Sequence, residues 1–284
     1  MERTTFLPLS IHKMAKLKQI VPNFYAQLLP KDVLNFDVTE NKATCHQCIM
    51  SRPRFRGKNP YRQDLKCCTF HPFFPNFLVG ATLLDQNKNQ AHQVVHTKLK
   101  NREFALPIGL VAPVAYQYEF QNRKVGDFGQ RDDFLCPFYD RSNGNCLQWE
   151  NRGVVCTTFF CRSDYGQKGK HFWSQLSDYL ANIEMALMEE ALVYLDFSPR
   201  RVNEMTDFLN RSEFNVKESR QWSISPKKFQ YFWNGYDQPI EFYKKSFQIV
   251  CEFDRKHIKE VLGQVEVDLL NRLYQSYEVK QSIV

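Results

Sequence analysis

The chain has 284 residues and a formal net charge of +7, and 43% of its residues are hydrophobic, which is enough to bury a core. It has no run of about 18 apolar residues, so no membrane-spanning helix is expected. The first residues, MERTTFLPLS, lack the apolar stretch of a secretory signal. Composition therefore predicts a cytoplasmic protein that does not contact the membrane.

Cysteine is the most informative residue type, with nine in the chain. Cys251 stands apart in an apolar stretch and is predicted to be ordinary core. The other eight form two groups of four: Cys45, Cys48, Cys67 and Cys68, then Cys136, Cys146, Cys156 and Cys161. In a reducing compartment, clustered cysteines indicate metal ligands rather than disulfides.

The first half of the chain alternates between irregular and helical patterns. Residues 1–41 read as an N-terminal arm, and residues 42–68 contain enough proline and glycine to predict a loop-rich segment. Residues 76–85 form an apolar run that favours a helix over a buried strand, because Asn76 suits a helix start. Residues 86–103 tolerate a helix, whereas the end of the run 104–120 alternates as a strand does.

The second half is predicted to be mostly helical. Apolar residues recur every three or four positions over 171–195, which indicates one long amphipathic helix. We expect its glutamates Glu184, Glu189 and Glu190 to form the solvated side. Ser-Pro pairs at 198–199 and 225–226 predict two further helix starts, and Gly263 predicts a break.

These patterns predict a fold that is mainly α with an irregular cysteine-rich metal-binding half, an α+β arrangement with few short strands. The expected division is an N-terminal arm over 1–41, a cysteine-cluster metal-binding domain over 42–165 and a helical region over 166–284 packed on it. The alternative is one continuous domain.

Cysteine spacing suggests how the ligands would converge. Cys45 and Cys48 are separated by two residues, the spacing of a chelating pair. Adjacent cysteines point apart, so Cys67 and Cys68 would serve two metals or two irons of one cluster. The Asn143-Gly144 turn would bring Cys136 and Cys146 together across a hairpin. His46 or His71 is a candidate additional ligand, and buried free thiols are the structural alternative.

The second group also carries a resemblance to a known family. The run C-P-F-Y-D-x3-G-x-C-L-Q-W-x2-R-x3-C, from Cys136 to Cys156, resembles the CxxCxxCC (YkgJ-like) cysteine-cluster family, described as zinc- or iron-chelating. The chain departs from its pattern at Gly153 and Thr157, and 18 residues separate Cys48 from Cys67 where the family is compact. The resemblance is to a longer bacterial subgroup without an established function. It implies metal binding and carries no enzyme activity across, although the family includes flagellin lysine N-methylase.

Two functions follow from these observations as expectations. The first is a cytosolic metal-binding protein whose eight cysteines hold an iron–sulfur or multinuclear centre, with redox or modification chemistry on a protein partner. The alternative is a structural-zinc binding module that contacts an acidic protein or nucleic acid through Arg52, Arg54, Arg56, Lys58 and Arg62. Nucleic acid is the less favoured partner, because acidic residues are also plentiful.

Overall fold

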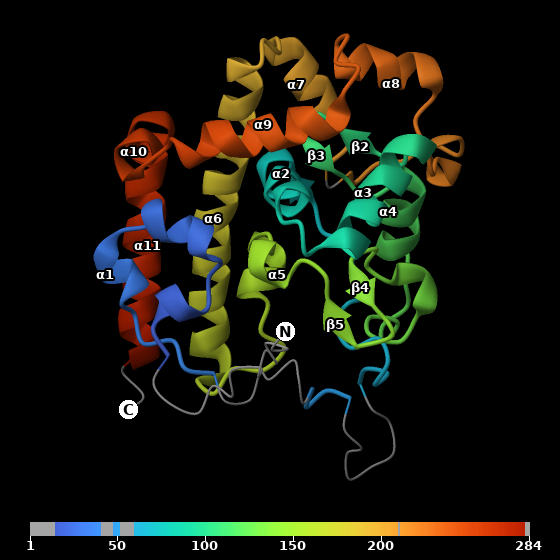
Figure 1. Ribbon diagram of the computed structural model, residues 1–284. Coiled ribbons are helices and arrows are strands. Elements are labelled where there is room, and N and C mark those ends of the chain that lie inside the picture. Colours follow the sequence, from blue (N-terminus) through green and yellow to red (C-terminus); the bar gives the residue numbers. More distant parts are fainter. Residues whose placement is uncertain (1–14, 41–47, 52–59, 210, 282–284) are drawn as a thin grey trace, which may run out of the picture.

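The computed structural model describes residues 15–40, 48–51, 60–209 and 211–281, and these residues are mainly helical, as predicted. A long helix, α6, runs through the middle of the molecule, and α11 lies alongside it (Figure 1). The helices are α1 Lys31–Leu34, α2 Asn76–Leu84, α3 Asn89–Asn101, α4 Val114–Gln121, α5 Val154–Thr158, α6 Gly166–Tyr194, α7 Pro199–Thr206, α8 Pro226–Trp233, α9 Pro239–Cys251, α10 Arg255–Leu262 and α11 Gln264–Gln281.

Helix α6 confirms the long amphipathic helix and begins five residues earlier than predicted. Its fully buried positions, among them Phe172, Leu176, Leu180, Ile183 and Leu187, recur at spacings of three and four. An apolar stripe of this width lets an amphipathic helix pack against several neighbouring helices at once. Helices α5, α9, α10 and α11 all contact α6.

A buried carboxylate holds the N-terminal segment against the start of α6. Glu40 is fully buried and accepts hydrogen bonds from Trp173 Nε1 and Ser163 Oγ, each at 2.8 Å. Nearby, Lys280 of α11 donates to the carbonyl of Asp37 at 3.3 Å. Buried polar groups are stable only when they are paired, so these bonds fix residues 37–40 between α6 and α11.

Helices α2 and α9 cross at very close range. A Cβ added at Gly80 of α2 would lie 1.9 Å from the carbonyl oxygen of Tyr243 in α9. A glycine costs helix stability, but here it permits backbone contact that no other residue allows. The Tyr243 hydroxyl donates to the carbonyl of Leu106 at 2.8 Å, which links α9 to the small sheet beside α2.

The strands are short and form two small sheets. β1 (Phe74–Pro75), β3 (Gly109–Leu110) and β2 (Ala105–Leu106) form an antiparallel sheet in that order, and β4 (Tyr139–Asp140) pairs with β5 (Asn145–Cys146) in a hairpin. The predicted strand at the end of 104–120 is wrong, because α4 begins directly after Pro113. Three of the first α4 residues are buried, so tertiary packing overrides the alternating pattern.

Local signals at the helix ends were reliable. Ser198 and Ser225 cap α7 and α8, with side chains that accept from the backbone N–H of Arg201 and Lys228. Gly263 separates α10 from α11 with a φ of 52°. The prediction of Cys251 as core is wrong: it is exposed at the end of α9.

We expect Gly80→Ala to destabilise the protein by at least about 2 kcal/mol, because the new methyl group meets backbone that cannot move aside. Helix propensity alone predicts the opposite sign, a gain of roughly 0.5–1 kcal/mol. The measurement is urea unfolding followed by circular dichroism.

Leu84→Ala is the matched control on the same helix, since Leu84 is 41% exposed. It should change the free energy of unfolding by less than about 1 kcal/mol. A Gly80→Ala variant as stable as the native chain would show that α2 and α9 do not cross this closely.

Candidate functional site

The described cysteines are spread over several elements. Cys48 lies in a turn, Cys67 and Cys68 precede the first sheet, Cys136 and Cys146 lie before and on the β4–β5 hairpin, Cys156 is in α5 and Cys161 follows it. All are free thiols. Cys45 and His46 lie outside the described residues.

The structure contradicts the predicted function as a protein with an eight-cysteine metal centre. Within residues 15–40, 48–51, 60–209 and 211–281, no three His, Cys, Asp or Glu side chains are grouped so that they could hold a metal ion. The described thiols are close enough in places to affect one another's pKa, as Cys67 and Cys68 do, but they do not form a ligand set. The same finding removes the structural-zinc alternative for these residues.

The hairpin register explains part of this result. Tyr139, not Cys136, pairs with Cys146 across the β4–β5 strands. The sulfur of Cys146 instead accepts from the backbone N–H of Gln148 at 3.4 Å. The predicted turn at Asn143-Gly144 is present, and Gly144 has the positive φ of 62° expected there.

His71 is held by two hydrogen bonds and belongs to no metal-ligand group among the described residues. Its Nδ1 lies 3.0 Å from the carbonyl oxygen of Pro72, so Nδ1 carries the hydrogen. Its backbone N–H bonds to the hydroxyl of Tyr116 at 2.8 Å. Burial lowers the pKa of His71 to about 3, so the ring is neutral at neutral pH.

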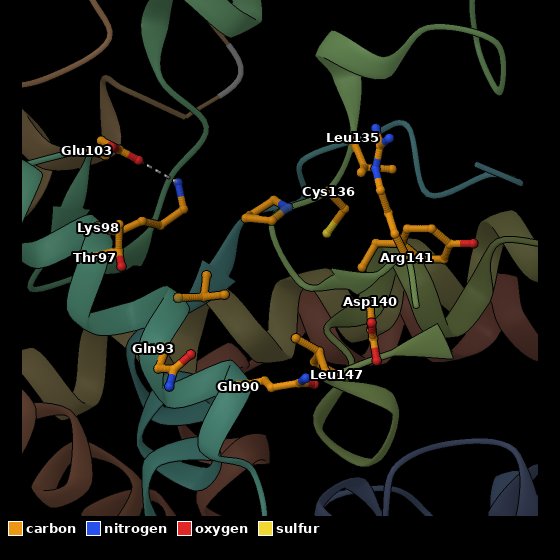
Figure 2. A pocket seen from close by; sticks show the side chains of 13 residues that line it. Gln90, Gln93, Thr97, Lys98, Glu103, Leu135, Cys136, Asp140, Arg141 and Leu147 are labelled. Carbon is orange, nitrogen blue, oxygen red and sulfur yellow. Dashed lines mark ion pairs between the residues drawn. The ribbon is translucent and has the colours of Figure 1, made fainter. Parts of the chain in front are cut away.

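A pocket of about 570 Å³ lies between α3 and the segment 135–147. Gln90, Gln93, Thr97 and Lys98 of α3 form one wall, as Figure 2 shows. The opposite wall carries Cys136, Asp140, Arg141 and Leu147. The lining combines apolar surface with a thiol and four charged side chains, because Glu103 also borders it.

Lys98 is the most unusual of these residues. Its side chain is only 6% exposed, and the nearest carboxylate oxygen, of Glu103, is 3.9 Å from Nζ (Figure 2). That distance is too long for a hydrogen bond. Burial lowers the pKa of Lys98, while Glu103 acts in the opposite direction. An ammonium group has three donors, and its one ion pair within the described part of the chain is this long contact with Glu103, although Cys136 and His71 also lie near enough to interact with its charge.

Asp140 and Arg141, on the opposite wall, have partners within the protein. Asp140 accepts from the Ser142 hydroxyl and the Asn143 amide, each at 2.6 Å, which closes the hairpin turn. Arg141 donates to Asp132 at 2.5 Å. Asp132 also forms an ion pair with Arg62. The positive charge of Arg62, one of the predicted basic surface residues, is therefore compensated by a neighbouring carboxylate. Arg52, Arg54, Arg56 and Lys58 lie outside the described residues.

No family model, no curated protein and no solved structure matches this chain. The resemblance to the cysteine-cluster family therefore stays a prediction from the sequence. The chemistry of the chain therefore follows from its own residues. Among the described helices, none is both long and apolar enough to span a membrane.

Sequence reasoning missed Lys98, although a signal was present. Ala91, Val95 and Lys98 are spaced by four and three residues on α3, and all three are buried. A lysine on the apolar face of a helix is rare unless it is paired or functional.

Glu184 is a second buried titratable group that the sequence placed wrongly. It was expected on the solvated side of the long helix, but it is 4% exposed. Its carboxylate accepts from the Tyr25 hydroxyl and, at 2.8 Å, from the backbone N–H of Val154 at the start of α5. Burial nevertheless raises the pKa of Glu184 to about 7.

We expect Glu184→Gln to stabilise the protein at pH 8 by roughly 1–3 kcal/mol. The folded chain holds the Glu184 proton more tightly than the unfolded chain, whose pKa is near 4.5. The native protein therefore loses stability as the pH rises from about 4.5 to about 7, and an amide oxygen can accept both hydrogen bonds without ionising. Urea unfolding between pH 4 and pH 8 measures the difference.

Asp178→Asn, at an exposed position of the same helix, is the control and should keep the pH dependence of the native chain, because it retains Glu184. If native and Glu184→Gln chains have parallel stability curves over this range, the carboxyl does not titrate with a raised pKa.

Proposed function

We propose that this protein binds a small polar molecule with a carboxylate group in the pocket between α3 and residues 135–147, and that Lys98 is the principal contact. The observation that carries the proposal is the Lys98 ammonium group. It is almost fully buried, borders the pocket and has only a loose ion pair to Glu103.

The energetics of a buried ammonium group support an anionic ligand. Removing a charge from water costs several kcal/mol unless hydrogen bonds and an opposite charge compensate. Glu103 compensates Lys98 only in part, because its Oε1 also accepts from Asn101 at 2.8 Å. A ligand carboxylate would supply the missing acceptors, and a charge-assisted hydrogen bond contributes about 1.5–3 kcal/mol.

Pocket size and lining restrict the ligand further. A space of about 570 Å³ suits a small molecule rather than a protein segment. Gln90, Gln93 and Thr97 offer amide and hydroxyl groups along the α3 wall, and Leu147 offers an apolar contact opposite. A short metabolite with several oxygen atoms and a small carbon skeleton matches these groups.

Other expectations from the sequence stay predictions beside this proposal. They are a cytoplasmic location and a protein partner, whereas the expected iron–sulfur or zinc cofactor is not proposed again. The described residues do not fit such a cofactor, since no suitable ligand group occurs among them, so no step of the proposed function involves a metal.

We expect Lys98→Met to weaken binding of short carboxylates at least about tenfold, which corresponds to about 1.4 kcal/mol. Methionine keeps much of the side-chain length and removes the charge. The measurement is isothermal titration calorimetry with acetate, pyruvate, glutarate and 2-oxoglutarate on the full chain.

Lys100→Met is the matched control, because Lys100 is exposed on the same helix. It should bind as the native chain does. Equal affinity of the Lys98→Met and native chains for every carboxylate would contradict the proposal, as would no binding by the native chain.

A further inference from the structure

We infer that Lys98 also captures its ligand covalently, as an imine with a carbonyl group, so that the ligand class is the 2-oxo acids. This inference rests on the proposed function, because the same pocket must first admit the carboxylate. It goes further because it assigns a covalent reaction to Lys98 in addition to the contact through its charge.

Comparison with the other buried lysines sets Lys98 apart. Lys280 is fully buried, but its Nζ bonds to the Asp37 carbonyl and lies over the rings of Tyr165 and Phe172. The side chain of Lys88 is 10% exposed and pairs with Glu150 at 2.6 Å. Both amines therefore already have close partners within the protein. Among the described lysines with so little exposure, Lys98 alone borders the pocket with a loose partner.

Glu103 supplies the proton transfers that imine formation needs. Its carboxylate lies 3.9 Å from Nζ, and a small side-chain movement brings the two within hydrogen-bonding range. Burial lowers the pKa of Lys98, because an ammonium group loses hydration inside the protein. It therefore favours the neutral amine, which is the nucleophile. The arrangement pairs a nucleophile with an adjacent acid–base group.

The step balances without any further reactant. Glu103 takes one proton from the ammonium group, and the free amine adds to the carbonyl carbon to form a carbinolamine. The carbinolamine oxygen leaves as water after it has taken protons from Glu103 and from the nitrogen. One C=N bond replaces one C=O bond, and one water molecule is released.

Arg141 on the opposite wall can orient the ligand carboxylate. Figure 2 shows Arg141 across the pocket from Lys98. A guanidinium group has five N–H donors, and the bond to Asp132 at 2.5 Å uses one of them. A ligand with a carbonyl group and a distal carboxylate can therefore contact both walls at once, as 2-oxoglutarate would.

The test is reductive trapping of the full chain with 2-oxoglutarate or pyruvate and cyanoborohydride, followed by intact-mass and peptide mass spectrometry. We expect one reduced adduct per chain, located at Lys98. Lys98→Met should give none, and Lys100→Met should react as the native chain does. Glu103→Gln should slow adduct formation at least about tenfold.

Comparing two ligands in the native chain separates the two proposals, because glutarate has the carboxylates of 2-oxoglutarate but no ketone that could form an imine. Glutarate should bind in calorimetry and give no adduct on reduction, whereas 2-oxoglutarate should bind and give the adduct. Adducts spread over exposed lysines, or none in a native chain that binds glutarate, would overturn the imine and leave the carboxylate site standing. A native chain that binds none of these acids would overturn both.

Discussion

The close crossing of α2 over α9 is the constraint on which the rest of the structure depends. Gly80 lets the two backbones meet, because a Cβ there would overlap the Tyr243 carbonyl oxygen. Tyr243 in turn bonds to Leu106 of β2, and β1 leads directly into α2. One residue without a side chain therefore sets the distance between the C-terminal helices and the sheet, and few other positions of α2 remain possible.

The position of α2 also determines both walls of the pocket. Thr82, two residues before the end of α2, is fully buried. Its carbonyl lies 2.9 Å from Nε2 of His92, which holds α3, and its hydroxyl lies 2.6 Å from Oε1 of Gln148, which holds the segment after β5. The wall that carries Lys98 and the wall that carries Arg141 are thus attached to the same residue. Pocket geometry is a consequence of core packing.

Signals that act within a few residues predicted the fold well, and signals that depend on distant packing did not. The spacing of Leu180, Ile183 and Leu187 was sufficient for α6, and Ser-Pro pairs were sufficient for two helix starts. The residues of α4 alternate in polarity, and only their packing makes them a helix. Cysteine spacing could not reveal that Tyr139 takes the place opposite Cys146.

The two missed residues share one cause. Glu184 lies four residues after Leu180 and three before Leu187, and Lys98 lies three after Val95, so each occupies the apolar stripe of its helix. Glu184 was expected on the solvated side, and no role was expected for Lys98. A charged residue at a core spacing is the stronger observation, since the fold must compensate its burial.

The end of α3 explains why Lys98 is compensated only loosely. Arg102 and Phe104 adopt the left-handed conformation with φ of 55° and 52°, and the Glu103 N–H bonds to the Lys98 carbonyl at 2.8 Å. The backbone thus turns Glu103 back toward Lys98, and the approach of the two side chains is set by the helix end rather than by their attraction. A closer pair would hold the proton on the amine. At 3.9 Å the carboxylate is near enough to exchange a proton and far enough to leave the amine available to a ligand.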